Sequence, residues 1–157
     1  MDEVSFTVTT ETPLQDDVRA LVAELNAWTL ERTPREFTHH LTVEQMADAS
    51  TTLFVARDAG GAPLGMGALK RHGGGVGEVK RMYVKPEAQG LGVGGALLRN
   101  IEALARGEKL TRLVLETGSN FDAARHVYER AAFAPCEPVL DYEPSQWTAF
   151  YAKDLAA

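Results

Sequence analysis

The feature that most constrains the fold of this 157-residue sequence is a glycine-rich loop between a predicted strand and a predicted helix. The strand covers residues 76–84, and four glycines follow within six positions: Gly90, Gly92, Gly94 and Gly95. Glycines let backbone N–H groups converge without obstruction by a Cβ atom, and a helix N-terminus adds unpaired N–H groups and a positive dipole end. We therefore predict an anion site suited to a phosphate or pyrophosphate. A tight turn that binds nothing needs fewer glycines.

Two common phosphate-binding patterns fit this loop poorly. Gly90-x-Gly92-x-x-Gly95 matches the dinucleotide fingerprint, and Glu116 lies about twenty residues further on. A dinucleotide fold, however, places the motif directly after its strand and continues into a second mononucleotide-binding half. Here residues 85–89 intervene, and only one further strand–helix unit follows. The P-loop pattern fails because no Gly-Lys-Ser/Thr follows the glycines.

Hydrophobic periodicity predicts alternating strands and helices along the chain. Strands are expected at residues 4–9, 53–56, 64–70, 76–84 and 113–115, followed by an extended segment from Phe133 onward and a strand at 147–151 that is expected to close the sheet. Helices are expected at about 15–31, 42–50 and 122–132, and a further helix after the glycine loop carries an apolar stripe from Leu97 to Ala105. Thr42 with Gln45 forms a capping-box pattern. This order predicts a mixed α/β or α+β arrangement. The length suits a single domain over residues 1–157.

The glycine loop and a later helix together resemble a known family. Gln89-x-x-Gly92-x-Gly94 closely resembles the Gln/Arg-x-x-Gly-x-Gly/Ala signature of the GCN5-related N-acetyltransferase (GNAT) superfamily. Residues 120–133 resemble the family's second motif, an Asn, a helix with a Tyr and then Gly-Phe, although an alanine, Ala132, stands before the Phe. The resemblance implies an α/β (α+β) fold with a mixed, mostly antiparallel sheet, two splayed central parallel strands and flanking helices.

The resemblance also implies an acetyl-CoA site and a role for each matching residue. The strand end, Met82, Tyr83 and Val84, is expected to hydrogen-bond the pantetheine arm and the acetyl group through its backbone. Asn120 is expected to contact the pantetheine or cofactor amides. Tyr128 is expected to act as general acid at the thioester sulfur, or alternatively to fill the core. The pyrophosphate is expected to meet the main-chain N–H groups of Gln89, Gly90, Leu91, Gly92, Val93, Gly94 and Gly95.

Acetyl transfer to an amine also needs a base, because only the neutral amine attacks the thioester carbonyl. Glu78 is the first candidate, since it aligns with the position where several family members carry a catalytic Glu. It lies four residues before Met82, which places both side chains on the same face of a regular strand. Glu78 could instead pair with Lys80 or Arg81 as a solvated carboxylate. Glu116 is the second candidate, and could instead merely end a buried strand.

The formal charge of −6 is unevenly distributed along the chain. Residues 1–58 carry −7, residues 59–112 carry +5 and residues 113–157 carry −4. The acidic total argues against a nucleic-acid partner. The acidic ends coincide with the segments expected to face the acceptor, which favours a cationic amine. The basic segment contains the glycine loop and offers these side chains for cofactor phosphates: Lys80, Arg81, Lys85, Arg99 and Lys109.

Composition favours a cytoplasmic protein without a membrane partner. The apolar runs are shorter than the ~18 residues of a membrane span, and the acidic start of the chain lacks a secretory pattern. The single cysteine, Cys136, excludes an internal disulfide and fits a reducing compartment. We expect His39 and His40 to lie in a solvated loop and expect no metal, because no companion ligand has metal spacing.

The sequence therefore predicts an acetyl-CoA-dependent N-acetyltransferase that acts on a primary amine of a small molecule by direct attack. The alternative is a non-catalytic acyl-CoA-binding sensor or regulatory domain of the same fold. The segments that shape the acceptor site carry no motif, so the acceptor stays open. Trp28, Phe37 and Trp147 either line that site or belong to the core. A homodimer is expected from the family resemblance alone.

Overall fold

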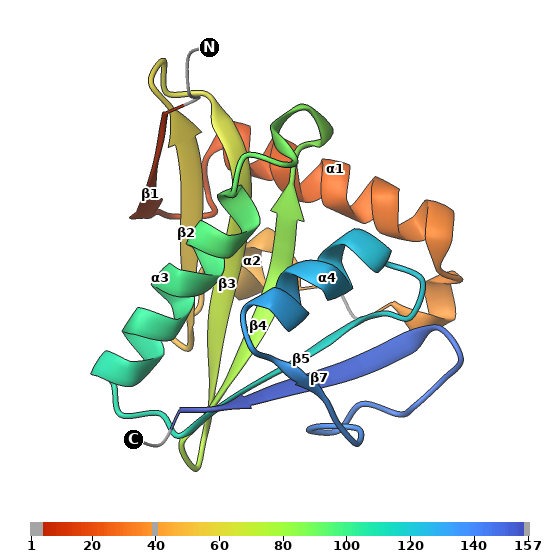
Figure 1. Cartoon of the computed structure of the whole chain (residues 1–157). Coiled ribbons are helices and arrows are strands. Elements are labelled where there is room, and N and C mark those ends of the chain that lie inside the picture. The colour runs from red at the N-terminus through yellow and green to blue at the C-terminus, as the bar shows by residue number, and fades with distance from the viewer. Residues whose placement is uncertain (1–4, 39–40, 156–157) are drawn as a thin grey trace.

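The structure, a computed structural model, describes residues 5–38 and 41–155 and contains a seven-stranded sheet with helices on both faces (Figure 1). The strand order is β1-β2-β3-β4-β5-β7-β6. The strands are β1 Phe6–Thr10, β2 Thr51–Asp58, β3 Pro63–Gly73, β4 Val76–Val84, β5 Arg112–Gly118, β6 Ala134–Pro135 and β7 Thr148–Asp154. The helices are α1 Asp16–Arg32, α2 Val43–Met46, α3 Val93–Gly107 and α4 Asp122–Arg130. Over the described residues, no helix combines the length and apolarity needed to cross a membrane.

The sheet is antiparallel except between β4 and β5. These two strands run parallel and pair only from Val76 with Arg112 to Glu78 with Val114. Beyond Glu78 the strands diverge, and the gap between them opens toward α4 and the end of α1 (Figure 1). This arrangement confirms the predicted mostly antiparallel sheet with two splayed central parallel strands.

The order of the last two strands differs from the expectation that the last strand closes the sheet. β7 lies between β5 and β6, and the two-residue β6 forms the edge. β7 pairs with β5 at seven positions, whereas β6 offers only Ala134 and Pro135. Proline lacks an N–H donor and is tolerated at a sheet edge, so the short strand takes the outer place.

Two apolar layers cover the sheet. The face that carries α1 and α2 (the α1 face) packs the predicted stripe of α1, Val18, Leu21, Val22 and Leu25, against β2 and β3. The face that carries α3 and α4 (the α3 face) buries the apolar sides of both helices against the sheet. On the α1 face of β5 and β7, where α1 and α2 do not reach, the segment 136–142 supplies the cover.

The capping box predicted before α2 is present, but the helix is shorter than expected. The Thr42 hydroxyl accepts from the Gln45 N–H, and the Gln45 side chain accepts from the Thr42 N–H. The helix ends at Met46 rather than near residue 50. The Asp48 carboxylate accepts a hydrogen bond from the Ser50 N–H at 2.7 Å. Such a turn competes with the helical hydrogen bonds and ends the helix.

The end of α4 explains why an alanine at position 132 is unusual. Ala132 adopts φ 70°, in the left-handed region. The N–H of Phe133 then bonds the carbonyl of Tyr128, which closes the helix end. A left-handed residue with a Cβ costs roughly 1 kcal/mol relative to glycine.

We therefore expect Ala132→Gly to raise the free energy of unfolding by roughly 0.5–1 kcal/mol. Urea denaturation measures the change. Ala123→Gly, at an exposed position within the same helix, is the matched control and should lower stability by about 1 kcal/mol. Destabilisation by both substitutions would contradict the assigned strain.

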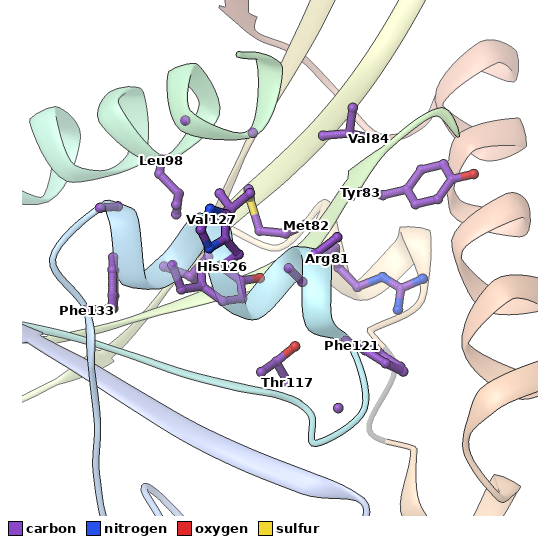
Figure 2. A pocket seen from close by; sticks show the side chains of 18 of the residues that line it. Arg81, Met82, Tyr83, Val84, Leu98, Thr117, Phe121, His126, Val127 and Phe133 are labelled. Atoms are coloured by element: carbon purple, nitrogen blue, oxygen red, sulfur yellow. The ribbon is translucent and has the colours of Figure 1, made fainter. Parts of the chain in front are cut away.

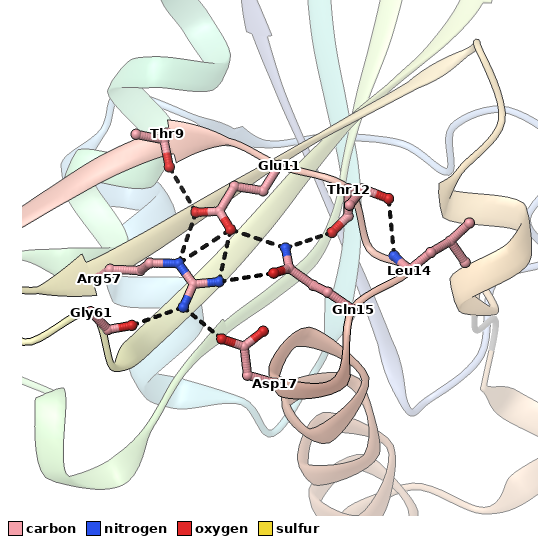
Figure 3. Close-up of polar contacts among 8 residues, drawn as sticks. All are labelled: Thr9, Glu11, Thr12, Leu14, Gln15, Asp17, Arg57 and Gly61. Carbon is pink, nitrogen blue, oxygen red and sulfur yellow. Dashed lines mark hydrogen bonds and ion pairs between the residues drawn. The ribbon is translucent and has the colours of Figure 1, made fainter.

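Arg57 on β2 joins the start of α1 to the sheet (Figure 3). Its guanidinium donates to both Glu11 carboxylate oxygens at 2.7–3.2 Å, to Asp17 at 2.6 Å and to the Gly61 carbonyl at 2.8 Å. Hydrogen bonds from Arg57 lower the pKa of Glu11 to about 2. These two acids of the N-terminal segment are therefore paired locally with one cation.

We expect Arg57→Met to lower the free energy of unfolding by about 1–3 kcal/mol at pH 7. The Glu11 pKa is depressed in the folded state, so the stabilisation is complete above its unfolded pKa of about 4.5 and is lost as the pH falls toward 2. Urea denaturation at pH 7 and pH 3 measures the difference between wild type and variant. It should be clearly smaller at pH 3. Arg19→Met, which removes a half-exposed contact 3.6 Å from Glu44, should change stability by less than about 0.5 kcal/mol.

Candidate active site

A cavity of about 1120 Å³ fills the gap between the diverging strands (Figure 2). Its walls come from β4, β5, the glycine loop, both α3 and α4, and the C-terminal end of α1. Most of the residues predicted to act in binding or catalysis line it: Glu78, Met82, Tyr83, Val84, Gln89, Gly90, Gly92, Val93, Gly94, Gly95, Asn120 and Tyr128. Leu91 is not among its lining residues and is 40% exposed.

The glycine loop ends in an N-terminus built to receive an anion. Gly90 and Gly92 adopt φ 83° and 84°, and Gly92 caps α3 without a side chain. The first backbone bond of the helix joins the Ala96 N–H to the Gly92 carbonyl, so the N–H groups of residues 93–95 have no helical acceptor. No acidic residue lies in the first turn. The loop therefore fits the pyrophosphate that its sequence predicts.

One side-chain hydrogen bond and one close helix contact hold this loop in place. The Gln89 amide donates to the Val84 carbonyl at 3.5 Å and ties the loop back to the end of β4. A Cβ at Gly94 would lie 3.3 Å from the Val127 side chain, so this glycine allows α3 to approach α4 closely. The glycines of the sequence signature thus leave the backbone N–H groups open to an anion and also let α3 pack closely on α4.

A bulge in β4 changes the predicted side-chain phase. Lys80 pairs with Ala68 and Tyr83 with Met66, so Arg81 and Met82 together face the single residue between those two partners. Arg81 adopts φ 55°. Such a bulge reverses the alternation of side chains. Residues before and after it that pack on the α3 face are Val79, Met82 and Val84.

The prediction that Glu78 and Met82 share a strand face is therefore wrong. Glu78 lies on the α1 face, and Met82 lies on the α3 face beside the cavity centre. Glu78 is 1% exposed, at the closed end of the splay. The alternative of a solvated carboxylate paired with Lys80 or Arg81 is wrong about solvation, but the pairing with Lys80 is present.

Three donors hold the Glu78 carboxylate. His72 Nε2 lies 2.7 Å from Oε1, while the Tyr142 hydroxyl and Lys80 Nζ lie 2.5 and 3.3 Å from Oε2. Burial and Glu78 raise the pKa of Tyr142, which keeps its hydroxyl protonated as a donor. Glu116 on β5 is half-buried, lines the same cavity and also raises the Tyr142 pKa by its charge. The two candidate bases thus belong to one polar cluster.

Sequence reasoning missed His72 and Tyr142. His72 lies at the end of the β3–β4 hairpin, in which Arg71 pairs with Gly77, so a correct hairpin register places it near Glu78. Tyr142 lies 64 residues beyond Glu78, in the segment that covers β5 and β7. No local pattern in the sequence indicates that approach.

Tyr128 and Asn120 lie on the β5 side of the cavity. Tyr128 is 5% exposed, and its ring lies 6.1 Å from that of Phe133. Burial raises its pKa, which keeps the hydroxyl protonated. Asn120 is exposed, and its amide donates to the Arg32 carbonyl at the end of α1 at 3.3 Å. Asn120 therefore also links the β5–α4 loop to α1.

The basic side chains predicted to surround the glycine loop are mostly elsewhere. Lys80 and Arg81 project from the α1 face, and Lys109 follows the far end of α3, so these three assignments are wrong. Lys85 adjoins the loop but lies 3.8 Å from a carboxylate of α1. Arg99, in the second turn of α3, lines the cavity.

Aromatic residues form the remaining wall. Trp28 and Trp147 both line the cavity. Trp28 also packs edge-on against Phe121, with ring centroids 4.4 Å apart. Phe37 lies in a short 3-10 turn after α1. His39 and His40 lie outside the described residues.

Comparisons with known proteins agree with this geometry. The sequence profile of the Acetyltransferase (GNAT) family matches residues 19–133. The "IAA acetyltransferase" of Azospirillum brasilense is 37% identical over 152 residues, which cover 96% of this chain and 99% of that relative. The chain belongs to the GNAT family of acetyltransferases. Family members use acetyl-CoA as co-substrate, and the predicted family is confirmed.

Other GNAT proteins match over the same extent. The "Uncharacterized N-acetyltransferase YedL" of Escherichia coli (strain K12) is 34% identical, over 96% of this chain and 95% of that relative. A crystal structure from Klebsiella pneumoniae, provisionally named an acyl-CoA N-acyltransferase, superposes with a TM-score of 0.81 at 30% identity. The match covers 96% of this chain and 98% of that one, and confirms the predicted fold.

We expect Gly92→Ala to weaken acetyl-CoA binding by about tenfold. Nothing lies within 4 Å of a Cβ added there, but φ 84° strains any L-residue, and relaxation turns the first-turn N–H groups away from the phosphate. Isothermal titration calorimetry measures the Kd. Gly107→Ala, at the other end of α3 with an equally open site and no positive φ, is the matched control and should keep the Kd unchanged. Equal Kd values for both variants would contradict the phosphate role of the loop.

Proposed function

We propose that residues 1–157 form a single domain that transfers an acetyl group from acetyl-CoA to a primary amine of a small molecule by direct attack. The observation that carries this proposal is a single cavity that joins the anion-binding start of α3 to the carboxylates of β4 and β5. Acetyl-CoA supplies the activated acetyl group. Family membership and the names of the relatives support N-acetyl transfer.

The glycine loop is proposed to hold the cofactor through backbone groups. The first-turn N–H groups of α3 face an anion without a competing acid, and Arg99 adds a positive charge one turn further. Backbone groups of β4 beyond Glu78 have no partner in β5, because the pairing stops there. Residues Met82 to Val84 are therefore free to bond an extended amide-bearing arm and to polarise the acetyl carbonyl.

Glu78 is proposed to take the proton from the acceptor amine. Its side chain is 1% exposed and both oxygens accept hydrogen bonds, so the proton reaches it through a water molecule or the Tyr142 hydroxyl. Glu116 is the alternative base. It lies on the same face of the sheet as Glu78, lines the cavity within the splay and is less buried than Glu78. Both carboxylates would also favour the approach of a cationic amine.

Tyr128 is proposed to protonate the leaving thiolate. Its raised pKa keeps the proton available at neutral pH, and its ring lines the cavity beside Val127 of α4. A hydroxyl positioned in this way supplies general-acid assistance.

A thiol-release assay across a panel of amines tests the proposal. Acetyl-CoA with amino acids, polyamines, aminoglycosides and peptide N-termini should give CoA release with at least one acceptor. Tight acetyl-CoA binding without CoA release from any of them would contradict catalysis and favour the sensor alternative.

We expect Glu78→Gln to lower kcat by at least about 100-fold, because a neutral amide cannot accept the proton. Glu116→Gln is the matched control, with the same change of one carboxylate in the same cluster, and should lower kcat by less than about tenfold. The reverse order would assign the base to Glu116.

A further inference from the structure

The bulge in β4 turns the side chain of Arg81 toward α1. Its left-handed φ of 55° is a conformation that costs an L-residue about 1–2 kcal/mol. Opposite the bulge, a Cβ at Gly67 would collide with the sulfur of Met82. The glycine therefore permits the bulge, and the bulge places the Arg81 side chain on the α1 face of the sheet. Figure 2 shows the Arg81 side chain extending from β4 toward α1, on the side of Phe121.

The guanidinium of Arg81 is buried without a counter-charge from the described residues. Arg81 is 8% exposed, and its Nη2 donates to the neutral Oδ1 of Asn26 on α1. Among residues 5–38 and 41–155 it makes no ion pair, and its buried Nε has no hydrogen-bond partner. Burial lowers the Arg81 pKa to about 10, which leaves the group charged at neutral pH. A buried cation with unused donors is costly unless an anion completes the site.

The cofactor phosphates are poor candidates for that anion. The phosphate-binding N-terminus belongs to α3, on the opposite face of β4, where Met82 and Val84 also project. Arg81 instead contacts α1, and α1 carries Trp28, which lines the same cavity. The anion that meets Arg81 therefore enters from the α1 face, which is the side left for the acceptor.

The surroundings of Arg81 define what else the acceptor carries. A second buried polar atom, Thr33 Oγ1, lines the cavity wall at the end of α1 and has no partner among the described residues. Trp28 and Phe121 add an apolar surface. Glu116 lies on the same face of the sheet, where it suits an ammonium group. The cavity thus offers separate positions for an anion, an amine and an apolar side chain.

We propose that Arg81, oriented by Asn26, binds a carboxylate of the acceptor, so that the acceptor is an amino acid. The planar guanidinium matches a carboxylate with two parallel hydrogen bonds. This inference rests on the proposed acetyl transfer and deepens it, because it names the class of amine. An acceptor of this class carries the expected cationic amine and has an anionic carboxylate next to it.

Matched acceptors test the proposal. CoA release is measured with phenylalanine, phenylalaninamide and phenethylamine, and with leucine and leucinamide, on the full chain. Wild type should prefer the carboxylate of each set by about 10- to 150-fold in kcat/KM, since a lost bond to a charged group costs about 1.5–3 kcal/mol. The amide has the more readily deprotonated amine, so this preference cannot arise from amine basicity.

Arg81→Gly is the decisive variant, because glycine also relieves the φ of 55° and should fold. The preference of this variant for the carboxylate over the amide should fall to within about threefold, mainly because KM for the carboxylate substrates rises. Its Tm should also rise. Arg112→Gln is the matched control, since Arg112 lies outside the cavity with a half-exposed side chain 3.9 Å from Asp154. It should keep the full preference.

Two results overturn the proposal and leave acetyl transfer intact. One is equal turnover of carboxylate and amide acceptors by wild type, and the other is an equal loss of kcat/KM for carboxylate and amide acceptors in Arg81→Gly. If no amine releases CoA, acetyl transfer itself fails, and tryptophan fluorescence decides the carboxylate site separately. Saturable quenching by phenylalanine, absent with phenylalaninamide and lost in Arg81→Gly, supports the site. No saturable change with phenylalanine overturns it.

Discussion

Three residue pairs join β4 to β5, and the cavity exists because the pairing stops after Glu78. Two parallel strands that diverge leave backbone donors and acceptors unpaired, and such groups need another partner. The opening is held from both sides. On one side, α4 is joined to β7, because Arg125 donates to the Tyr151 hydroxyl and that hydroxyl donates to Glu129. On the other side, the contact of Trp28 with Phe121 and the bond from Asn120 to Arg32 link the β5–α4 loop to α1. The rest of the site is arranged around this opening.

The bulge at Arg81 divides the opening into two halves. Without it, regular alternation would place Arg81 on the α3 face and Met82 on the α1 face. With it, apolar Met82 and Val84 border the cofactor side, and the guanidinium borders the α1 side. A strained backbone angle and a buried charge both reduce stability, and both occur at one residue. Strain of this kind accumulates where function requires a particular side-chain position.

Local patterns predicted most of the fold. The glycine loop, the stripe of α1 and the capping box at Thr42 depend on neighbours within a turn or two, and each is present. The prediction failed where the position of a side chain depends on contacts between segments that are distant in the sequence. A bulge shows no sequence signal in β4 itself, so Glu78 was placed on the wrong face. Tyr142 reaches Glu78 only because residues 136–142 cover β5 and β7, which periodicity does not indicate.

Charge counted along the sequence also differs from charge in the cavity. The acidic first segment suggested attraction of a cation, yet Glu11 and Asp17 are paired with Arg57 at the far end of α1 from the cavity. The basic segment suggested cofactor phosphates, yet Lys80 is bound to Glu78. After such pairing, the local field depends on the few groups that remain within the low-dielectric cavity. A buried guanidinium there acts on a bound ligand more strongly than the segment totals do, because solvent and salt screen the charges that lie outside the cavity.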